Sequence, residues 1–245
     1  MRIYCSGFES ENSFGHGLDK IFLNELKEYK SIVYIPGGEA KIEKSINKYI
    51  PSFHNHFKKI GITFENEILI TPDMGVEKAK NAIDNADFIF LMGGDPFKQK
   101  KICEDLNIIE NLKNYKGLMV GFSAGAMFMS KYIIITPCSE EYPDFQIEEG
   151  LNLDDISIYP HNNIDDDKYP DILVAGDEKY AKDDLIKVAN EYGEFYLLQD
   201  YLREDGLKNI SAIVCDKNIK KYTEYNGRIW KATKGDIVLI KNLDL

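Results

Sequence analysis

A glycine-spaced serine lies between two apolar runs near the middle of the chain, and this stretch most constrains the fold. Leu118-Met119-Val120 has the character of a buried strand, and residues 124–129 have the character of a buried helix. Between them, Gly121-Phe122-Ser123-Ala124-Gly125 has the Gly-x-Ser-x-Gly spacing of a sharp strand–turn–helix connection. Glycine tolerates strained backbone and lets strand and helix approach closely. The stretch therefore predicts a turn that presents the hydroxyl of Ser123.

Apolar runs alternate with segments of helical periodicity over the first half of the chain. The patterns predict strands at 3–5, 31–36, 67–70, 87–92 and 118–120, separated by helices at 18–26, 42–60, 76–86 and 102–112. This order predicts right-handed βαβ units and a mostly parallel sheet. The loops at Ser6, Gly37, Gly93 and Ser123 are then expected at one rim, outside the carboxyl ends of the strands. Short strands beyond residue 195 predict a β-rich C-terminal edge, and residues 1–245 are expected to form a single domain.

The composition excludes several classes of protein. The chain has 245 residues, 44% hydrophobic and 12% aromatic, which indicates a folded globular protein. A net charge of −11 argues against nucleic-acid binding as the main function. Four widely spaced cysteines give no zinc motif and no disulfide framework, so a reducing cytoplasm is expected. No signal peptide or apolar run long enough for a membrane span is expected from the sequence. A homodimer is possible, and the sequence does not decide the oligomeric state.

A serine hydroxyl needs a base within hydrogen-bond reach before it can act as a nucleophile. The chain has four histidines: His16, His54, His56 and His161. Only His161 follows Ser123, and it lies directly after a predicted strand, where the base of such a site is expected. His54 and His56 are expected to be solvated on a lysine-rich helix face, and His16 is undecided.

The base in turn needs a carboxylate that orients it. If the acid lies between the serine and the histidine, the candidates are Glu140, Glu141, Asp144, Glu148, Glu149, Asp154 and Asp155. Asp154 and Asp155 precede the strand that leads to His161 and are expected at its far end. Glu141 follows the extended segment after the elbow helix and is our choice, with Glu140 and Asp144 as alternatives.

Gly93-Gly94-Asp95 follows the strand expected beside the serine elbow. Backbone N–H groups of Gly94 and Ala124 are expected to form a two-donor oxyanion hole, although an ordinary strand-to-helix turn would have the same sequence. Asp95 and Asn162 are expected to contact the substrate. The residues themselves supply nucleophile, base and oxyanion donors, so no metal and no organic cofactor is expected.

Three ordered motifs resemble one known family. Gly121-Phe122-Ser123-Ala124-Gly125-Ala126 is similar to the GxSAGA signature of peptidase family S51, which holds the peptidase E type aspartyl dipeptidases and the cyanophycinases. Residues 90–97 resemble its apolar-GGN-x-F segment, and residues 150–161 resemble its GLNL…PH segment. The resemblance implies a three-layer α/β/α fold of the class I glutamine amidotransferase-like, flavodoxin-like type. It also implies Ser123 as nucleophile, His161 as base, and Gly94 and Ala124 as oxyanion donors.

Two departures from the family pattern affect the site. The aspartate of peptidase E relatives falls at about Cys138, whereas the later carboxylate of cyanophycinase-like members favours Glu141. The loop after His161 carries Asp165-Asp166-Asp167 and only Lys168, and the next arginine is Arg203. Aspartyl dipeptidases of this family hold the acidic side chain of the substrate with a basic residue beyond the histidine, and Lys179 and Lys182 are candidates for that role here. Specificity for Asp-X bonds is therefore open.

These observations lead to one expected function and two alternatives. We expect a cytoplasmic serine peptidase that hydrolyses a small peptide or amide, in the manner of a dipeptidase. One alternative is an α/β-hydrolase esterase, which shares the Gly-x-Ser-x-Gly pattern but normally places its histidine nearer the C-terminus. The other is a catalytically impaired relative that binds a small molecule or a protein.

Overall fold

The fold is built around an eight-stranded sheet. The computed structural model describes residues 1–8, 14–26, 30–137, 140–163, 172–175, 178–202, 204, 206–216, 219–224 and 227–240. Seven strands lie in the order β13-β14-β1-β5-β4-β2-β3, and β15 pairs with β14. Their bounds are β1 (Arg2–Cys5), β2 (Ser31–Gly37), β3 (Asn66–Leu69), β4 (Phe88–Gly94), β5 (Leu118–Phe122), β13 (Asp200–Leu202), β14 (Lys208–Cys215) and β15 (Ile219–Glu224).

The N-terminal strands of this sheet are parallel, as the alternating pattern predicted. β1 pairs with β5, β5 with β4, β4 with β2, and β2 with β3, all in parallel register. β14 then adds antiparallel to β1, and β13 and β15 add antiparallel to β14. The carboxyl ends of the parallel strands meet at one rim: Ser123 N donates to Cys5 O at 3.0 Å, and Asp95 N donates to Gly37 O at 3.0 Å.

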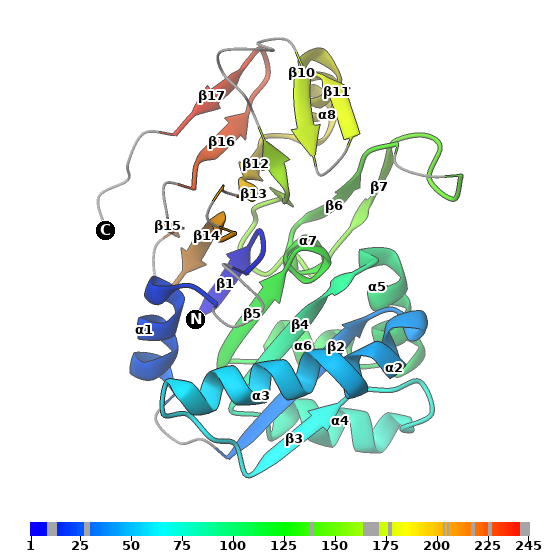
Figure 1. Cartoon of the computed structure of the whole chain (residues 1–245). Coiled ribbons are helices and arrows are strands. Elements are labelled where there is room, and N and C mark those ends of the chain that lie inside the picture. The colour runs from blue at the N-terminus through cyan, green and yellow to red at the C-terminus, as the bar shows by residue number, and fades with distance from the viewer. Residues whose placement is uncertain are drawn as a thin grey trace.

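Helices cover both faces of the sheet. One face packs against α1 (His16–Glu25) and α3 (Ile50–Lys59), and α3 crosses in front of the sheet in Figure 1. The other face packs against α4 (Val76–Asp84), α5 (Pro96–Asp105), α6 (Ile109–Asn114) and α7 (Ala124–Met129). Alternate residues of each strand point into the two cores, which is why Tyr34 and Phe90 lie in the first core and Val33 and Leu91 in the second. The predicted three-layer α/β/α arrangement is confirmed.

Smaller sheets form the β-rich C-terminal part, which lies beyond the central sheet in Figure 1. β6 (Tyr132–Ile135) and β7 (Gln146–Glu149) form a hairpin. A second sheet contains β8 (Ile158–Tyr159), β12 (Phe195–Leu198), β16 (Ile229–Ala232) and β17 (Ile237–Leu239), and a third contains β9 (Asn162–Asn163), β10 (Ile172–Ala175) and β11 (Glu178–Ala181). Helix α8 (Lys182–Tyr192) packs its buried Leu185 and Ala189 with Trp230 of β16.

Two predicted helices are interrupted. The predicted helix over 102–112 is split into α5 and α6 at Asn107, whose φ of 51° is left-handed and therefore cannot continue a right-handed helix. The predicted helix over 42–60 consists of α2 (Ile42–Lys44), η2 (Ser45–Tyr49) and α3, because its hydrogen-bond spacing changes along its length, and η1 (Glu39–Lys41) precedes it. Within the described residues, no helix has both the length and the apolar character needed to cross a lipid bilayer.

Candidate active site

Ser123 occupies a sharp turn between β5 and α7. Its backbone has φ 52° and ψ −112°, a conformation that side-chain-bearing residues adopt at a cost of about 1–3 kcal/mol. Two hydrogen bonds hold the turn: Ser123 N donates to Cys5 O at 3.0 Å, and Met127 N donates to Ser123 O at 3.1 Å. The turn is therefore anchored to β1 on one side and to the first turn of α7 on the other.

The two glycines around Ser123 allow α7 to lie directly on the sheet. A Cβ at Gly121 would lie 2.5 Å from the carbonyl carbon of Gly125, and a Cβ at Gly125 would lie 2.3 Å from the carbonyl oxygen of Leu91. Both contacts are with backbone, which cannot move aside as a flexible side chain would. The Gly-x-Ser-x-Gly spacing is thus explained by close packing of β5, α7 and β4.

The Ser123 hydroxyl contacts His161, and His161 contacts a buried carboxylate. Ser123 Oγ lies 2.7 Å from His161 Nε2, and His161 Nδ1 lies 3.0 Å from Asp200 Oδ2. An ionised carboxylate only accepts hydrogen bonds, so Nδ1 donates to Asp200. Nε2 of the neutral ring then accepts from the Ser123 hydroxyl. This arrangement can move a proton from the hydroxyl to the ring.

Asp200 is the first residue of β13 and is held in place by the start of the chain. Ser6 Oγ donates to Gln199 O at 2.7 Å, and Ser211 Oγ donates to the same carbonyl at 3.2 Å. Gly7 leaves room for the carboxylate, because a Cβ there would lie 2.3 Å from Asp200 Oδ2. The side chain of Asp200 is only 2% exposed. Segments almost two hundred residues apart in sequence therefore position this group.

Glu141 does not reach His161. Its carboxylate is 57% exposed and accepts from Lys98 Nζ at 2.9 Å, a bond that also raises the pKa of Lys98. Three other acids weighed from the sequence also have partners elsewhere. Glu148 pairs with Lys100 and Asp155 with Lys131, while Asp154 bonds Tyr4 and Arg2. The carboxylate beside His161 is Asp200.

The structure shows why sequence reasoning passed over Asp200. The candidates were restricted to the chain between Ser123 and His161, and Asp200 lies beyond both. Two signals were present: the apolar run of β12 ends directly before Gln199-Asp200, and Ser6-Gly7 follows β1 with small side chains. Neither signal shows that Ser6-Gly7 and Asp200 lie side by side. That contact depends on the antiparallel pairing of β14 with both β1 and β13.

Gly93 and Gly94 end β4 beside the serine turn, because β4 pairs with β5 through Leu91 and Gly121. A Cβ at Gly93 would lie 3.7 Å from Ser123 Cβ. Gly94 has φ 147°, and a Cβ there would lie 2.4 Å from Gly37 O, so this position requires glycine. Ala124 begins α7, and the N–H of a first helical residue has no acceptor within its own helix. Ala124 thus directly follows Ser123, and Gly94 follows the glycine that lies beside Ser123.

The side chain of Asp95 is engaged in holding α5. Oδ1 accepts from Phe97 N at 2.9 Å and from Lys98 N at 3.0 Å, as an N-cap does. Oδ2 accepts from the hydroxyl of Tyr142 at 2.7 Å. This contact ties the segment before β7 to the end of β4.

Asn162 lies in β9, directly after His161, and its side chain is fully buried. Its two polar side-chain atoms have no hydrogen-bond partner among the described residues. Several other positions considered from the sequence are either not described or already paired. Cys138, residues 164–171 and Arg203 lie outside the described residues, and the side chain of Lys179 does also. Lys182 pairs with Asp236.

The prediction that His54 and His56 are solvated is wrong for His56, whereas the side chain of His54 is 41% exposed. His56 is 6% exposed; its Nε2 accepts from Phe14 N at 3.3 Å and lies 2.9 Å from Asp19 Oδ1. His54 is partly exposed and bonds Glu67, which also accepts from the hydroxyl of Tyr34. Their contacts connect α3 with α1, with Phe14 before α1, and with β3. The helical spacing showed only the lysines and missed the partners that come from other elements.

Cys5 lies beside the serine turn but is not a rival nucleophile. Its thiol is fully buried, and burial raises its pKa well above the usual value. A thiol that stays protonated is a poor nucleophile. Among the described residues, no three His, Cys, Asp or Glu side chains gather as a metal site.

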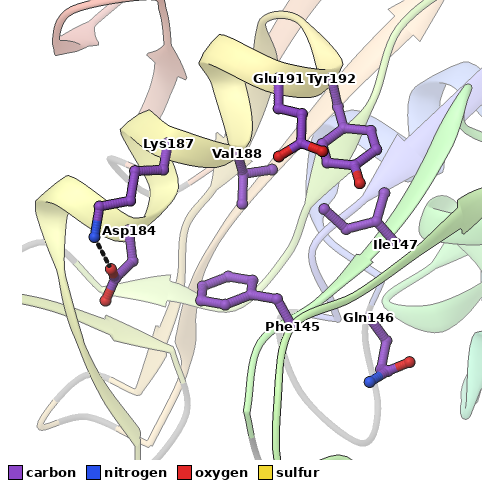
Figure 2. Close-up of a pocket in the computed structure, with 8 residues that line it drawn as sticks. All are labelled: Phe145, Gln146, Ile147, Asp184, Lys187, Val188, Glu191 and Tyr192. Atoms are coloured by element: carbon purple, nitrogen blue, oxygen red, sulfur yellow. Dashed lines mark hydrogen bonds and ion pairs between the residues drawn. The ribbon is translucent and has the colours of Figure 1, made fainter.

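A separate open groove of about 410 Å³ lies between the β6–β7 hairpin and α8, and Figure 2 shows its lining side chains. Apolar side chains of Phe145, Ile147, Val188 and Tyr192 form part of it, with charged residues of α8 at the side. Ser123, His161 and Asp200 are not among the residues that line it. The groove is thus distinct from the Ser123–His161–Asp200 arrangement.

A comparison with models of known protein families identifies the family of this chain. The model of peptidase family S51 matches residues 3–192. The chain belongs to peptidase family S51. This match includes Ser123 and His161 and ends before Asp200. Membership in family S51 supports a peptide-hydrolysing enzyme and favours it over an α/β-hydrolase esterase. None of the curated proteins matches the chain.

Two solved structures of peptidases are similar in fold to this chain. One is a "putative peptidase E protein" from Listeria monocytogenes EGD-e, with a TM-score of 0.55 and 16% identity over 91% of this chain and 97% of that one. The other is a peptidase from an acI-B1 Actinobacterium, with a TM-score of 0.53 and 14% identity over 93% of this chain and 88% of that one. At these identities the likeness shows the fold, and it agrees with the mixed α/β sheet described above.

Proposed function

We propose that this S51 member is a serine peptidase that hydrolyses short peptides or amides. The observation that carries the proposal is the continuous hydrogen-bonded line from Ser123 Oγ through His161 to the buried Asp200. Ser123 is the nucleophile, His161 is the general base and acid, and Asp200 takes the role first expected of Glu141. Membership in a peptidase family supports the peptide substrate.

The residues support a two-step acyl transfer. His161 Nε2 takes the hydroxyl proton as Ser123 Oγ attacks the scissile carbonyl carbon. N–H groups of Gly94 and Ala124 receive the developing oxyanion, a contribution commonly worth several kcal/mol. His161 returns the proton to the leaving amine as the C–N bond breaks, which leaves an acyl-serine. Water, deprotonated by His161, then hydrolyses this ester and restores Ser123.

Asp200 holds His161 in the tautomer that this reaction needs. Its bond to Nδ1–H leaves Nε2 as the acceptor for the serine proton, and its negative charge stabilises the imidazolium that forms. Its burial keeps water from competing for the Nδ1 hydrogen bond. The Ser123 hydroxyl forms no capping hydrogen bond with α7, so it is available to His161.

A fluorophosphonate probe tests the nucleophile without knowledge of the substrate. We predict that the wild-type chain is labelled on the peptide that contains Ser123, that Ser123→Ala abolishes labelling, and that His161→Ala slows it by orders of magnitude while the chain stays folded. Mass spectrometry locates the label, and circular dichroism checks the fold. A folded wild-type protein that takes no label, or a label on another serine, would contradict the proposal.

The substrate class is tested by a library of dipeptides and isopeptides that includes Asp-X and β-aspartyl-arginine members. We expect cleavage of short members with a free terminus and none of a folded protein substrate. Loss of turnover in Ser123→Ala is the control. Cleavage of aryl esters with no cleavage of any peptide would favour the esterase alternative.

A further inference from the structure

Asp200 has a second cationic neighbour besides His161. Lys208 Nζ lies 3.3 Å from Asp200 Oδ1 and 3.5 Å from Oδ2. Lys208 is the first residue of β14 and faces Leu202 in the β13–β14 pairing. The same pairing that places Asp200 at the site therefore places an ammonium group behind it.

The surroundings of Asp200 make this ammonium important. A buried carboxylate is strongly disfavoured unless hydrogen bonds and opposite charge compensate for the water it has lost. His161 satisfies Oδ2, whereas Oδ1 has no hydrogen-bond partner among the described residues and meets only Lys208 at ion-pair distance. Ser6 and Gly7, which approach from the β1 side, bring no charge. Among the described residues, Lys208 is thus the permanent positive charge that faces Asp200.

We propose that Lys208 is a positioning residue of the catalytic site and acts through Asp200. Its ammonium group holds the carboxylate in place, and its charge offsets part of the negative potential that Asp200 exerts on His161. This proposal rests on the proposed serine-peptidase function. Lys208 touches neither Ser123 nor His161 in the contacts described, so its effect passes through the carboxylate.

The sign of its effect on pH dependence follows from electrostatics. With Lys208 present, the charge of the carboxylate that faces His161 is partly balanced. Without Lys208 the unbalanced carboxylate favours protonated His161, and the acid limb of the activity profile moves to higher pH. Lys208 is 43% exposed, so solvent screens it, and we expect a shift of about one pH unit.

The test measures the second-order rate of Ser123 phosphonylation between pH 5 and pH 9, which needs no substrate. We expect Lys208→Met to move the acid limb upward by about one unit. We also expect it to lower the plateau rate about tenfold, because the carboxylate is then less firmly held against His161. Lys208→Arg restores the charge and is expected to keep the wild-type limb. Lys101→Met is the matched control, because Lys101 pairs with Asp105 on the exposed side of α5 and its loss removes one charge without touching Asp200.

Thermal unfolding of each variant separates positioning from a purely structural role. A lower melting temperature with an unmoved acid limb would overturn the proposal, as would an equal shift in Lys101→Met. If Lys208→Met does not fold, Lys208→Gln takes its place, with the same expected direction. A wild-type protein that is not phosphonylated would defeat the proposed function itself. Labelled wild type with an unmoved limb in the Lys208 variants would defeat only the role of Lys208.

Discussion

At the scale of single residues, the sequence pointed to two members of the candidate site, and the fold was needed to find the carboxylate beside them. Ser123 stands out in the sequence because a glycine lies two residues to either side of it. The structure explains these glycines by backbone contacts of 2.5 Å or less. His161 stands out because it is the one histidine after Ser123. Asp200 has no local signature of this kind. Its role depends on strand pairing, which a one-dimensional pattern does not encode.

Mutation of Asp200 and of Glu141 distinguishes which carboxylate acts on His161. We predict that Asp200→Asn lowers the rate of Ser123 phosphonylation by about three orders of magnitude, because an amide in place of the carboxylate removes the charge and disturbs the His161 tautomer. Glu141→Gln is the matched control and is expected to stay within about twofold of wild type, since Glu141 forms only an exposed pair with Lys98. The reverse ranking of these two variants would restore Glu141 as the acid.

At the scale of elements, the sequence predicted the parallel strands and most of the helices. Apolar runs bounded by Gly and Pro marked β2, β4 and β5, and these strands are confirmed. The break at Asn107 was missed because helical periodicity continues from Ile102 to Leu112 across it. The partners of His56 were missed because they come from α1 and from Phe14 rather than from its own helix. Local patterns thus gave the elements, and packing decided what their side chains contact.

The contact of α7 with β4 leads to a prediction about stability. Alanine in place of a helical glycine normally stabilises a protein by about 0.5–1 kcal/mol. We predict the opposite for Gly125→Ala, a loss of about 2–3 kcal/mol, because its Cβ would lie 2.3 Å from Leu91 O. Urea unfolding measures the free energy. Gly235→Ala is the control, since nothing lies within 4 Å of its Cβ position. Equal effects of the two changes would disprove the close contact.

At the scale of the whole molecule, buried cysteine thiols and a buried tyrosine hydroxyl on both sides of the sheet determine how the stability of the fold depends on alkaline pH. Burial raises the pKa of the Cys215 thiol from 9.0 to about 12, with Asp154 adding to the shift. Burial also raises the pKa of the Cys5 and Cys103 thiols and of the Tyr4 hydroxyl, the last helped by Asp154. All four groups lie in the two cores that cover the sheet. The expectation that the chain forms one domain stays a prediction.

These groups predict a loss of stability in alkali. Their pKa values are higher in the folded protein than in the unfolded chain, so they contribute full stability below about pH 9. Above that pH the unfolded chain releases protons that the folded protein keeps, and the free energy of unfolding falls as the pH rises toward 12. Urea unfolding at pH 8, 9 and 10 measures the decline. Cys215→Ala is expected to reduce its slope, and an unchanged stability through pH 10 would contradict the prediction.

The tie between Ser6, Gln199 and Ser211 has a consequence for a chain that is still being synthesised. A nascent polypeptide that ends near residue 192 already contains Ser123 and His161, yet it lacks β13 and β14. Asp200 reaches its place only after β14 has emerged from the ribosome and added to β1 at the opposite end of the chain. The proposed catalytic line therefore depends on the synthesis of β13 and β14, which follow Ser123 and His161 in the sequence.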